Sequence, residues 1–310
     1  MQARVSLVSG TIVTNYVELQ AEDMARIAEF CNRNFDFHRG QFAAEPLRRT
    51  IFDDQDYKSE HGFIVLDSEG VVGVMVGVQR GQEAWLKLFA VDKDRRRLQI
   101  ARQMLDELEG RFRSAGVKRV HTLNSSPHYV MPGLDVRYTA GVCLLKGRGY
   151  QLDQYVHNMR VDLDSAEFDT GEAELALAGQ GIIFRRLRHE DEPALRPWID
   201  GNWGSSWATE ACNSLTNDPV TSHVAINDGR IVGFGTYDVM ALTSGFGPTG
   251  VEESMRGLGL GKILLFRCLE DMKKRGDRHC EVTWVGPISY YAHTVSARIS
   301  STLMHSTKVL

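Results

Sequence analysis

The stretch VEESMRGLGLGKILLFRCLEDMKKRG, from Val251 to Gly276, decides how the chain is interpreted. Gly257, Gly259 and Gly261 alternate directly after Arg256, and an apolar-striped helix is expected to follow them. Glycine within a helix costs about 0.5–1 kcal/mol relative to alanine, which favours a functional reason for three of them over a simple helix-starting turn. The unpaired amides at a helix start attract an anion, and the Arg256 guanidinium can add a charge-assisted contact. The pattern therefore predicts a phosphate site.

Two common phosphate-binding turns do not fit this stretch. A P-loop needs GxxxxGK followed by Ser or Thr, but Ile263 follows Lys262 and Arg256 stands where the first glycine is required. A dinucleotide fingerprint needs GxGxxG, whereas the spacing here is GxGxG. The pattern that fits is Arg-x-x-Gly-x-Gly between a strand and a helix, with Arg256, Gly259 and Gly261.

Composition narrows the class of protein. A chain of 310 residues has room for two domains, and its formal charge of −4 argues against a nucleic-acid partner. No apolar run approaches the roughly 20 residues that span a bilayer, and residues 1–16 do not have the pattern of a signal peptide. The five cysteines are scattered without a CxxC pair, and the ten histidines have no ligand spacing. We therefore expect a cytoplasmic protein without a metal, a disulfide framework or a membrane partner.

The chain repeats itself with a constant offset of 160 residues. Val91 matches Val251, Arg96 matches Arg256, Leu105 matches Leu265 and Gly116 matches Gly276. This offset indicates the duplication of one domain, with each copy long enough to build its own core. We expect a first domain at residues 1–164, a linker at 165–181 that contains a short helix, and a second domain at 182–310.

Each half is expected to alternate strands and helices. The patterns that predict them in the first half are strands at 11–19, 84–91, 118–123 and 155–163, with helices at 21–35 and 98–115. In the second half they are strands at 182–187, 244–251 and 278–285, with a helix at 190–203 that is interrupted near Pro197. The strand at 155–163 is expected to close the first half.

The segment from Gly250 to Gly276 resembles the acetyl-CoA-binding segment of the GNAT superfamily of N-acetyltransferases. The resemblance extends to YYAHTVSARI, at 290–299, which is similar to that family's penultimate helix. As a whole, the chain resembles a tandem GNAT protein. The resemblance implies an α/β (α+β) fold with two mixed β-sheets, each splayed between its fourth and fifth strands and flanked by helices. It implies that acetyl-CoA, the acyl donor, binds at Gly250, Val251, Arg256, Gly257, Leu258, Gly259, Leu260, Gly261 and Lys262.

The same resemblance implies that an amine attacks the thioester directly and that a tyrosine protonates the departing thiolate. Tyr291 is the expected general acid, and Tyr290 takes this role if the helix register differs by one residue. No general base is assigned among the candidates Glu252, Glu253, Asp238 and His293. Trp203 and Trp207 flank a flexible Gly-Ser-Ser turn, where they either hold the acceptor or fill the core.

The first half is expected to be catalytically silent. Arg97, Gln99 and Ala101 stand where the second half has its three glycines, so we expect crowding to leave one acetyl-CoA site per chain. Leu145 aligns with Tyr291, and leucine has no proton to donate. An insertion at 124–139 either covers the partner domain's cleft or stabilises the domain pairing.

The predicted function is transfer of an acetyl group from acetyl-CoA to the amine of a small molecule by the second domain. The alternatives are a protein N-acetyltransferase and a non-catalytic acyl-CoA-binding or scaffolding protein. The sequence leaves open whether the chain is a monomer or a homodimer.

Overall fold

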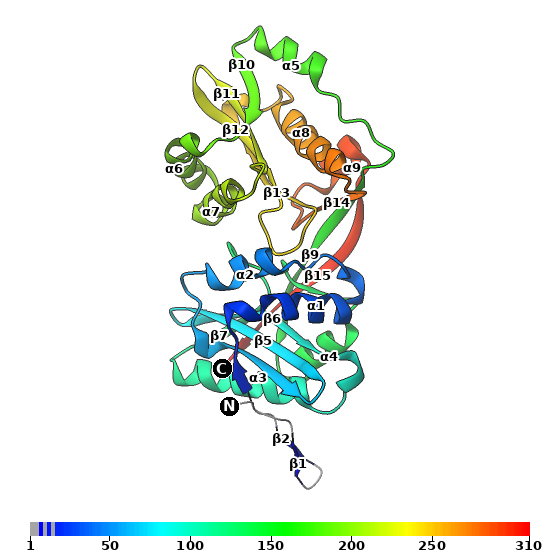
Figure 1. Ribbon diagram of the computed structural model, residues 1–310. Helices are drawn as coiled ribbons and strands as arrows, with labels where there is room; N and C mark the ends of the chain where they lie inside the picture. Colours follow the sequence, from blue (N-terminus) through cyan, green and yellow to red (C-terminus); the bar gives the residue numbers. More distant parts are fainter. Residues whose placement is uncertain (1–5, 9–10, 14–15) are drawn as a thin grey trace. The chain divides into compact units, whose positions relative to one another are not determined.

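The computed structural model describes residues 6–8, 11–13 and 16–310, and divides the chain into two compact units (Figure 1). Unit 1 contains the chain up to residue 156 together with residues 240–243 and 302–310. Unit 2 contains residues 157–239 and 244–301. Both units mix strands and helices, in agreement with the fold class expected from the sequence.

The elements of unit 1 follow the predicted order. They are β3 (Tyr16–Glu18), α1 (Met24–Asn34), α2 (Ala44–Phe52), β4 (Gly62–Asp67), β5 (Gly70–Arg80), β6 (Glu83–Val91), α3 (Ile100–Ser114), β7 (Arg119–Thr122), β8 (Leu134–Asp135), α4 (Thr139–Gly147) and the first half of β9 (Gln151–Asp162). The strand expected at 11–19 is divided. β2 (Thr11–Val13) pairs with β1 (Ser6–Val8), β3 pairs with β4, and residues 14 and 15 lie outside the described residues.

The sheet of unit 1 is antiparallel from β3 to β6 and splayed at the next pair. β6 and β7 are parallel and hydrogen-bonded only from Glu83 to Leu86, so residues 87–91 of β6 have no strand partner on that edge. Helix α3 packs closely on β5 because two strand glycines leave room for it. A Cβ at Gly77 would lie 2.5 Å from the ring of Phe112, and one at Gly73 would lie 2.7 Å from the sulfur of Met104.

Unit 2 repeats this plan. Its elements are α5 (Gly171–Ala178), β10 (Ile182–Arg186), α6 (Glu192–Trp203), α7 (Ser205–Asn213), β11 (Ser222–Asn227), β12 (Arg230–Tyr237), β13 (Gly245–Val251), α8 (Leu260–Arg275), β14 (His279–Val282), α9 (Ile288–Val295) and the first residues of β15 (Arg298–Val309). The parallel pair of β13 and β14 joins only Gly245 and Phe246 to Glu281 and Val282, which gives the same splay. None of the helices in the described part of the chain is long and apolar enough to cross a membrane.

Helix α6 is continuous, so the interruption expected near Pro197 is wrong. Pro197 lies in the second turn, where it removes one backbone donor, and the buried side chains of Leu195 and Ile199 hold the helix against the core on either side of it.

The segment 165–181 is packed against unit 2. It contains the short helix expected there, α5. Phe168 is buried with its ring centroid 5.5 Å from that of Phe266, and the Glu174 carboxylate pairs with Arg267 at 2.5 Å. These contacts anchor a segment that composition alone identified as a linker.

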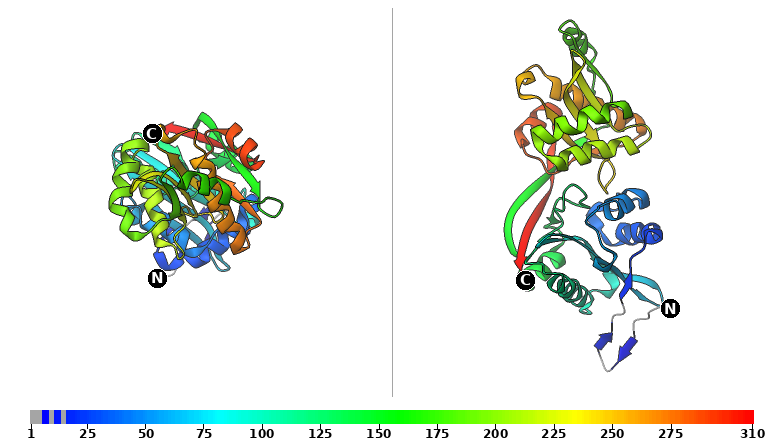
Figure 2. Two further views of the ribbon diagram at one scale, coloured as in Figure 1. Left: turned by 90° about the horizontal axis from the view of Figure 1, so that it is seen from above. Right: turned by 90° about the vertical axis from the view of Figure 1, so that its left-hand side faces the viewer.

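The last strand of each unit comes from the other half of the sequence. Residues 159–162 of β9 pair with β14 in unit 2, so the prediction that this strand closes the first half is wrong. Unit 1 is closed instead by β15, whose residues 307–309 pair with β7 and whose red ribbon ends at the C-terminus (Figure 2). An alternating strand pattern defines which face is buried but does not name the partner strand, and the sequence therefore did not reveal this exchange.

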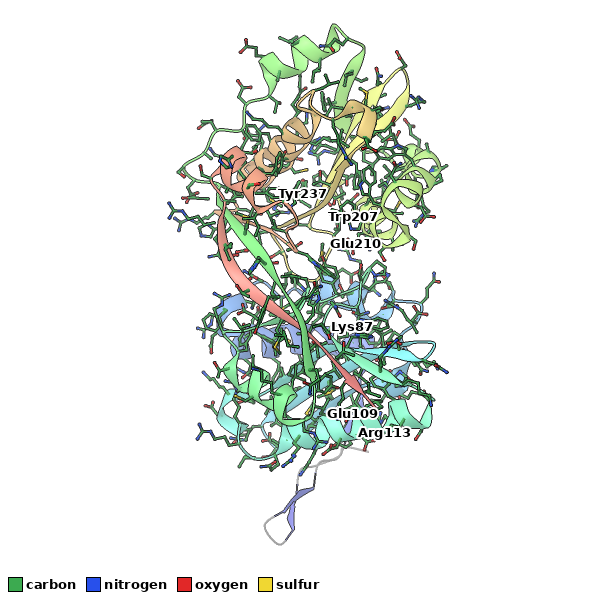
Figure 3. The ribbon with its side chains drawn as sticks, turned by 180° about the vertical axis from the view of Figure 1, so that it is seen from behind. Lys87, Glu109, Arg113, Trp207, Glu210 and Tyr237 are labelled. Carbon is green, nitrogen blue, oxygen red and sulfur yellow. The ribbon has the colours of Figure 1, made fainter. Side chains whose placement is uncertain are left out.

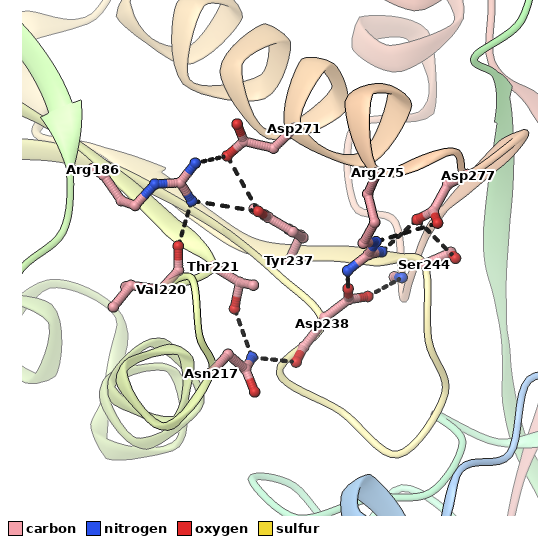
Figure 4. Close-up of polar contacts among 11 residues, drawn as sticks. Arg186, Asn217, Val220, Thr221, Tyr237, Asp238, Ser244, Asp271, Arg275 and Asp277 are labelled. Carbon is pink, nitrogen blue, oxygen red and sulfur yellow. Dashed lines mark hydrogen bonds and ion pairs between the residues drawn. The ribbon is translucent and has the colours of Figure 1, made fainter.

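Two polar networks hold α8 of unit 2 against its sheet (Figure 4). The Asp271 carboxylate accepts hydrogen bonds from Arg186 at 2.7 Å and from Tyr237 at 3.2 Å, and lies 2.7 Å from His223. Burial alone would raise the pKa of Asp271, but His223 and Arg186 hold it below its usual range. Nearer the C-terminal end of α8, Arg275 bridges Asp238 and Asp277. One helix is thereby fixed to β10, β11 and β12, which sets the position of its N-terminus.

The C-terminal strand is held to unit 1 by a buried ion pair, which gives a first prediction. Glu109 on α3, labelled in Figure 3, is fully buried and accepts from Lys308 on β15 at 2.6 Å and from the Tyr150 hydroxyl at 3.1 Å. Lys308→Met should lower the free energy of unfolding by about 1–2 kcal/mol because it removes the closer of two cations from the buried Glu109 carboxylate, which keeps Arg113 at 3.3 Å. Urea unfolding measures this change.

The matched control is Lys274→Met, which breaks a largely exposed pair with Glu270 on α8. Exposed pairs contribute little, so the loss should stay below about 0.5 kcal/mol. Equal losses in the two variants would show that Lys308 does not secure β15.

Candidate acetyl-CoA site

The glycine loop of unit 2 has the backbone of an open anion cradle. Gly257 and Gly259 both have φ of +86°, and Gly259 caps α8 in the left-handed conformation. A Cβ at either position would meet no atom within 4 Å. This left-handed backbone favours glycine, and the space above both positions is open to a ligand. The Lys262 and Ile263 amides donate to the Gly259 carbonyl, so the amides of Leu260 and Gly261 are the ones that a helix start leaves without an intrahelical acceptor.

The other predicted cofactor residues surround this loop. Val251 ends β13 beside Gly261, whose Cβ would lie 3.7 Å from the Val251 methyl. Arg256 is mostly exposed, and its guanidinium lies 3.7 Å from the exposed Glu253 carboxylate. Because this ion pair is long and exposed, the guanidinium can turn toward a ligand. Lys262 places its ammonium 5.1 Å from the Phe266 ring centroid. Leu258 is exposed and Leu260 is buried, so only the backbone of Leu260 is available to a ligand.

Gly250 has a different role from the loop glycines. A Cβ there would lie 2.7 Å from the Trp203 indole, so this glycine admits a ring against β13. Trp203 stacks on Trp207, with centroids 6.0 Å apart and 19° between their planes, and both contact Phe234. The two tryptophans therefore fill the core between α6, α7 and β12. Their predicted contact with the acceptor stays a prediction.

Unit 1 keeps the same loop backbone without the glycines. Arg97 and Gln99 have φ of 65° and 64°, and Gln99 caps α3 in the left-handed conformation, as Gly259 caps α8. A non-glycine residue in this region costs about 1 kcal/mol or more, so the loop shape is retained against its local preference.

The crowding expected at the loop of unit 1 stays a prediction. A cavity of about 670 Å³ lies over this loop, and Arg97, Gln99 and Ala101 are among the residues that line it. The side chains of Arg97 and Gln99 are exposed and border this cavity. The insertion at 124–139 also lines this cavity through Met131, Leu134, Arg137, Tyr138 and Thr139, a role that the sequence did not suggest.

The two tyrosines of α9 point to different surroundings. Tyr291 is 6% exposed and packs in the core with its ring 6.4 Å from that of Phe246. Tyr290 is 36% exposed, and its hydroxyl lies 3.5 Å from the Cβ position of Gly261, at the start of α8. Burial raises the pKa of both phenols. Tyr290 is therefore the tyrosine whose hydroxyl adjoins the glycine loop.

The corresponding helix of unit 1 shows the same difference between neighbouring residues. Leu145, the counterpart of Tyr291, is buried in the core of unit 1, whereas its neighbour Leu144 lines the cavity. The position of Leu144 corresponds to that of Tyr290. In both units the earlier residue of the pair faces the site.

The strands β6 of unit 1 and β13 of unit 2 each contain a bulge, and the two bulges hold different residues. In unit 1 the pairing of β5 with β6 shifts at Lys87, and in unit 2 the pairing of β12 with β13 shifts around Gly247. The offset of 160 makes these residues counterparts. A Cβ at Gly247 would lie 3.8 Å from the Thr283 hydroxyl, so the absence of a side chain leaves space there. The buried Oγ1 of Thr283 has no hydrogen-bond partner within the described residues. No sequence motif singled out Thr283, because a lone threonine after a strand has no distinctive pattern.

The structure limits the choice of general base. Asp238 is engaged by Arg275, and the Glu252 carboxylate accepts from Ser254 at 2.7 Å. The His293 ring nitrogen Nδ1 lies 2.7 Å from the Ser289 carbonyl. No base is assigned to these residues.

Sequence comparison now gives the family. The model of the Acetyltransferase (GNAT) family matches residues 24–129 and 184–292, more than half of the chain. The chain belongs to this GNAT family. Each matched region contains one glycine-loop position, at 96–101 or 256–261, so the GNAT domain is present twice. No curated protein sequence matches the chain.

Solved structures show the same tandem fold. A GNAT protein from Sphaerobacter thermophilus matches with a TM-score of 0.66 and 16% identity over 98% of this chain and 97% of its own. A tandem GNAT protein from the clavulanic acid biosynthesis pathway gives a TM-score of 0.66 and 16% identity over 96% and 98%. The glucosamine N-acetyltransferase region of a fungal multi-domain β-N-acetylglucosaminidase gives 0.72 and 15% over 96% of this chain, which spans only 38% of that protein.

The site predicts the effect of a charge at Gly261. Gly261→Glu places a carboxylate beside the first amides of α8 without a positive φ to strain it, so the fold should survive. The KM for acetyl-CoA should rise at least tenfold, about 1.4 kcal/mol, because the carboxylate repels the diphosphate. Gly201→Glu makes the same change at an unobstructed helical glycine of unit 2 and should leave the KM unchanged. An unaltered KM in folded Gly261→Glu would mean that the loop is only structural.

Proposed function

We propose that unit 2 transfers an acetyl group from acetyl-CoA to the primary amine of a small molecule. The observation that carries the proposal is the position of the Tyr290 hydroxyl beside an unobstructed glycine loop, at the end of a splayed strand. A loop that only bound acyl-CoA would need the glycines but no such hydroxyl. Family membership supports acetyl transfer in general, and the proposal adds the unit, the acceptor class and the residues.

The splay between β13 and β14 provides the place for the thioester. Beyond Phe246, the backbone of β13 has no partner strand on the β14 side, so its amides and carbonyls can pair with the extended arm of acetyl-CoA. The diphosphate lies on the glycine loop beside Arg256. Backbone donors directed at the thioester carbonyl stabilise the oxyanion that forms when the amine attacks.

The reaction itself is a direct transfer. The amine nitrogen forms a bond to the thioester carbon, the C–S bond breaks, and the Tyr290 phenol donates its proton to the departing thiolate. The proton lost by the amine leaves through water, since no side chain is assigned as the base. Tyr291, the acid expected from the sequence, is less well placed for this role because its ring is in the core.

The acceptor side supports a compact amine. Gly247 leaves the bulge of β13 open, and the unpartnered Thr283 hydroxyl lies at its edge. A hydroxyl or amine of the acceptor would satisfy this buried oxygen, which favours a polar small molecule.

The direct test is a screen of small amines, including glucosamine and other amino sugars, with thiol release from acetyl-CoA as the readout. Acetylation of at least one small amine, abolished by Gly261→Glu, is the expected result. Activity confined to peptide or protein amines would favour the protein N-acetyltransferase. No thiol release from any amine would favour a non-catalytic protein.

Two conservative changes decide which tyrosine is the acid. Tyr290→Phe should lower kcat by roughly 10²-fold or more with little change in the KM for acetyl-CoA, because the hydroxyl matters only as charge develops on sulfur. Burial raises the pKa of Tyr290, so the protonated acid persists to higher pH than an ordinary phenol near 10, and the basic limb of the wild-type profile should lie above it. That limb should be absent in Tyr290→Phe.

Tyr291→Phe is the matched control, since it removes one buried hydroxyl and should leave kcat within a few-fold of wild type. If Tyr291→Phe loses turnover and Tyr290→Phe keeps it, the register expected from the sequence is right. Full turnover in both variants would exclude a tyrosine acid.

Thr283 tests the acceptor side. Thr283→Val keeps the shape and removes the orphan hydroxyl, so stability should be unchanged or slightly higher, by up to about 1 kcal/mol. The KM for the amine should rise about tenfold while the KM for acetyl-CoA stays constant. Thr216→Val, at an exposed position of unit 2, should change neither constant. An unchanged KM for the amine in Thr283→Val would remove this residue from the acceptor site.

A further inference from the structure

We propose that Asn158 is a positioning residue for the acetyl transfer in unit 2. It holds the backbone of Trp284 in a bulge at the end of β14, and it thereby directs the Thr283 hydroxyl toward the space at Gly247. This role rests on the proposed function, to which it adds a residue from the first half of the sequence. The sequence did not single out Asn158, because its strand was expected to close the first half.

The pairing of β14 with β9 changes directly after the last residue of β14. The two strands are antiparallel, and residues 279–282 pair with residues 162–159 in an unbroken register. Continued by two residues, this register would place Trp284 opposite His157. The His157 carbonyl accepts instead from the amide of the next residue, Val285, at 2.8 Å. Trp284 is therefore an extra residue on this side of the pair, which makes the turn a bulge.

The bulge has a backbone that suits glycine but contains a tryptophan. Trp284 has a φ of 48°, in the left-handed region. A bulky residue is uncommon there, and such a conformation persists only where the surrounding contacts impose it. The Trp284 amide donates a hydrogen bond of 3.0 Å to the side-chain Oδ1 of Asn158. Asn158 is 6% exposed, so water has little access to compete for this bond.

The residue before the bulge is fixed through both of its peptide groups. On one edge, the Thr283 amide donates to the Phe246 carbonyl of β13 at 3.3 Å. On the other edge, the bond to Asn158 holds the amide of Trp284, which belongs to the peptide group that follows Thr283. Thr283 is therefore restrained on both sides, and its buried hydroxyl is kept 3.8 Å from the Cβ position of Gly247. Bulges redirect side chains beside active sites in this way.

The same place in unit 1 is built differently. The offset of 160 makes Leu123 the counterpart of Thr283, and the strand beside it is β15 in place of β9. The register of β15 with β7, continued by two residues, places His305 opposite Leu123. The buried His305 ring lies 3.2 Å from the side-chain amide of Asn124, so a side chain meets the exchanged strand there. A leucine has no hydroxyl to direct, and the bond from the exchanged strand to the backbone amide occurs in the unit that has the hydroxyl.

Variants of Asn158 test the positioning role in the acetylation assay. Asn158→Leu removes the acceptor of the Trp284 amide at similar volume, and the KM for the amine should rise about tenfold. The KM for acetyl-CoA should stay constant, because the glycine loop is unchanged. Asn158→Asp keeps an acceptor oxygen and should stay within about threefold of the wild type. Met159→Leu changes the neighbouring buried side chain of β9 at similar volume and should alter neither constant.

A double variant shows whether Asn158 acts through Thr283. The KM for the amine in Asn158→Leu/Thr283→Val should equal that of Thr283→Val alone. A residue that acts only by directing the hydroxyl has no further effect once the hydroxyl is absent, so the two changes should not add.

Hydrogen exchange tests the contact without any substrate. Labelling with [15N]tryptophan marks the backbone amides of the five tryptophans, and Trp284→Phe assigns one of them. The Trp284 amide should be protected in the wild type and in Asn158→Asp, and should exchange at least tenfold faster in Asn158→Leu. The Trp203 amide, at the end of α6, is the internal control and should not change.

The outcomes separate this role from the proposed function. An unprotected Trp284 amide in the wild type would overturn the contact, whether or not Asn158→Leu folds. An unchanged KM for the amine in folded Asn158→Leu, an equal rise in both KM values, or additive effects in the double variant would overturn the positioning role and leave the proposed function intact. A wild type that acetylates no amine would overturn the proposed function, and the role of Asn158 with it.

Discussion

The rest of this structure depends on a parallel strand pair that separates after a few residues. The pairing of β6 with β7 ends at Leu86, and the pairing of β13 with β14 ends at Phe246. Beyond these residues, β6 and β13 have backbone groups without a strand partner on that edge. A buried backbone group without a partner costs about 1–3 kcal/mol, so a gap of this kind is tolerated where water or a ligand satisfies it. The glycine loops, the tyrosine of α9 and the bulge residues are all placed around this gap.

The two copies of the domain divide these features between them. Unit 2 keeps the glycines, the phenol and an open bulge, and its loop is close to electrically neutral. Unit 1 has Arg97, Gln99 and Ala101 in place of the glycines and Lys87 at its bulge, while the loop keeps its left-handed backbone.

The sequence predicted the features that depend on local pattern. The duplication, the glycine loop, the helices at 98–115 and after Leu260, and the short helix within 165–181 follow from periodicity and turn residues. The sequence did not predict the features that depend on contacts between residues far apart in the chain. The exchange of β9 and β15 between the units joins strands that are far apart in the chain. Tyr290 and Tyr291 cannot be distinguished by spacing, since one residue changes the face of a helix by about 100°. Thr283 and Lys87 become notable only through their neighbours.

The exchanged final strands have a consequence for biosynthesis. The edge of β7 pairs with residues 307–309, which are translated after all of unit 2, so unit 1 stays unfinished until the second half of this sequence has been made. Its open edge exposes unpaired backbone groups during that time, a state that favours chaperone binding or aggregation. A chain that stopped before residue 307 would lack the strand that pairs with β7 in unit 1. Conversely, a break in the segment 165–181 would leave two fragments that each lack a strand held by the other. The duplicated domains are thus obliged to be made, and to be degraded, as one molecule.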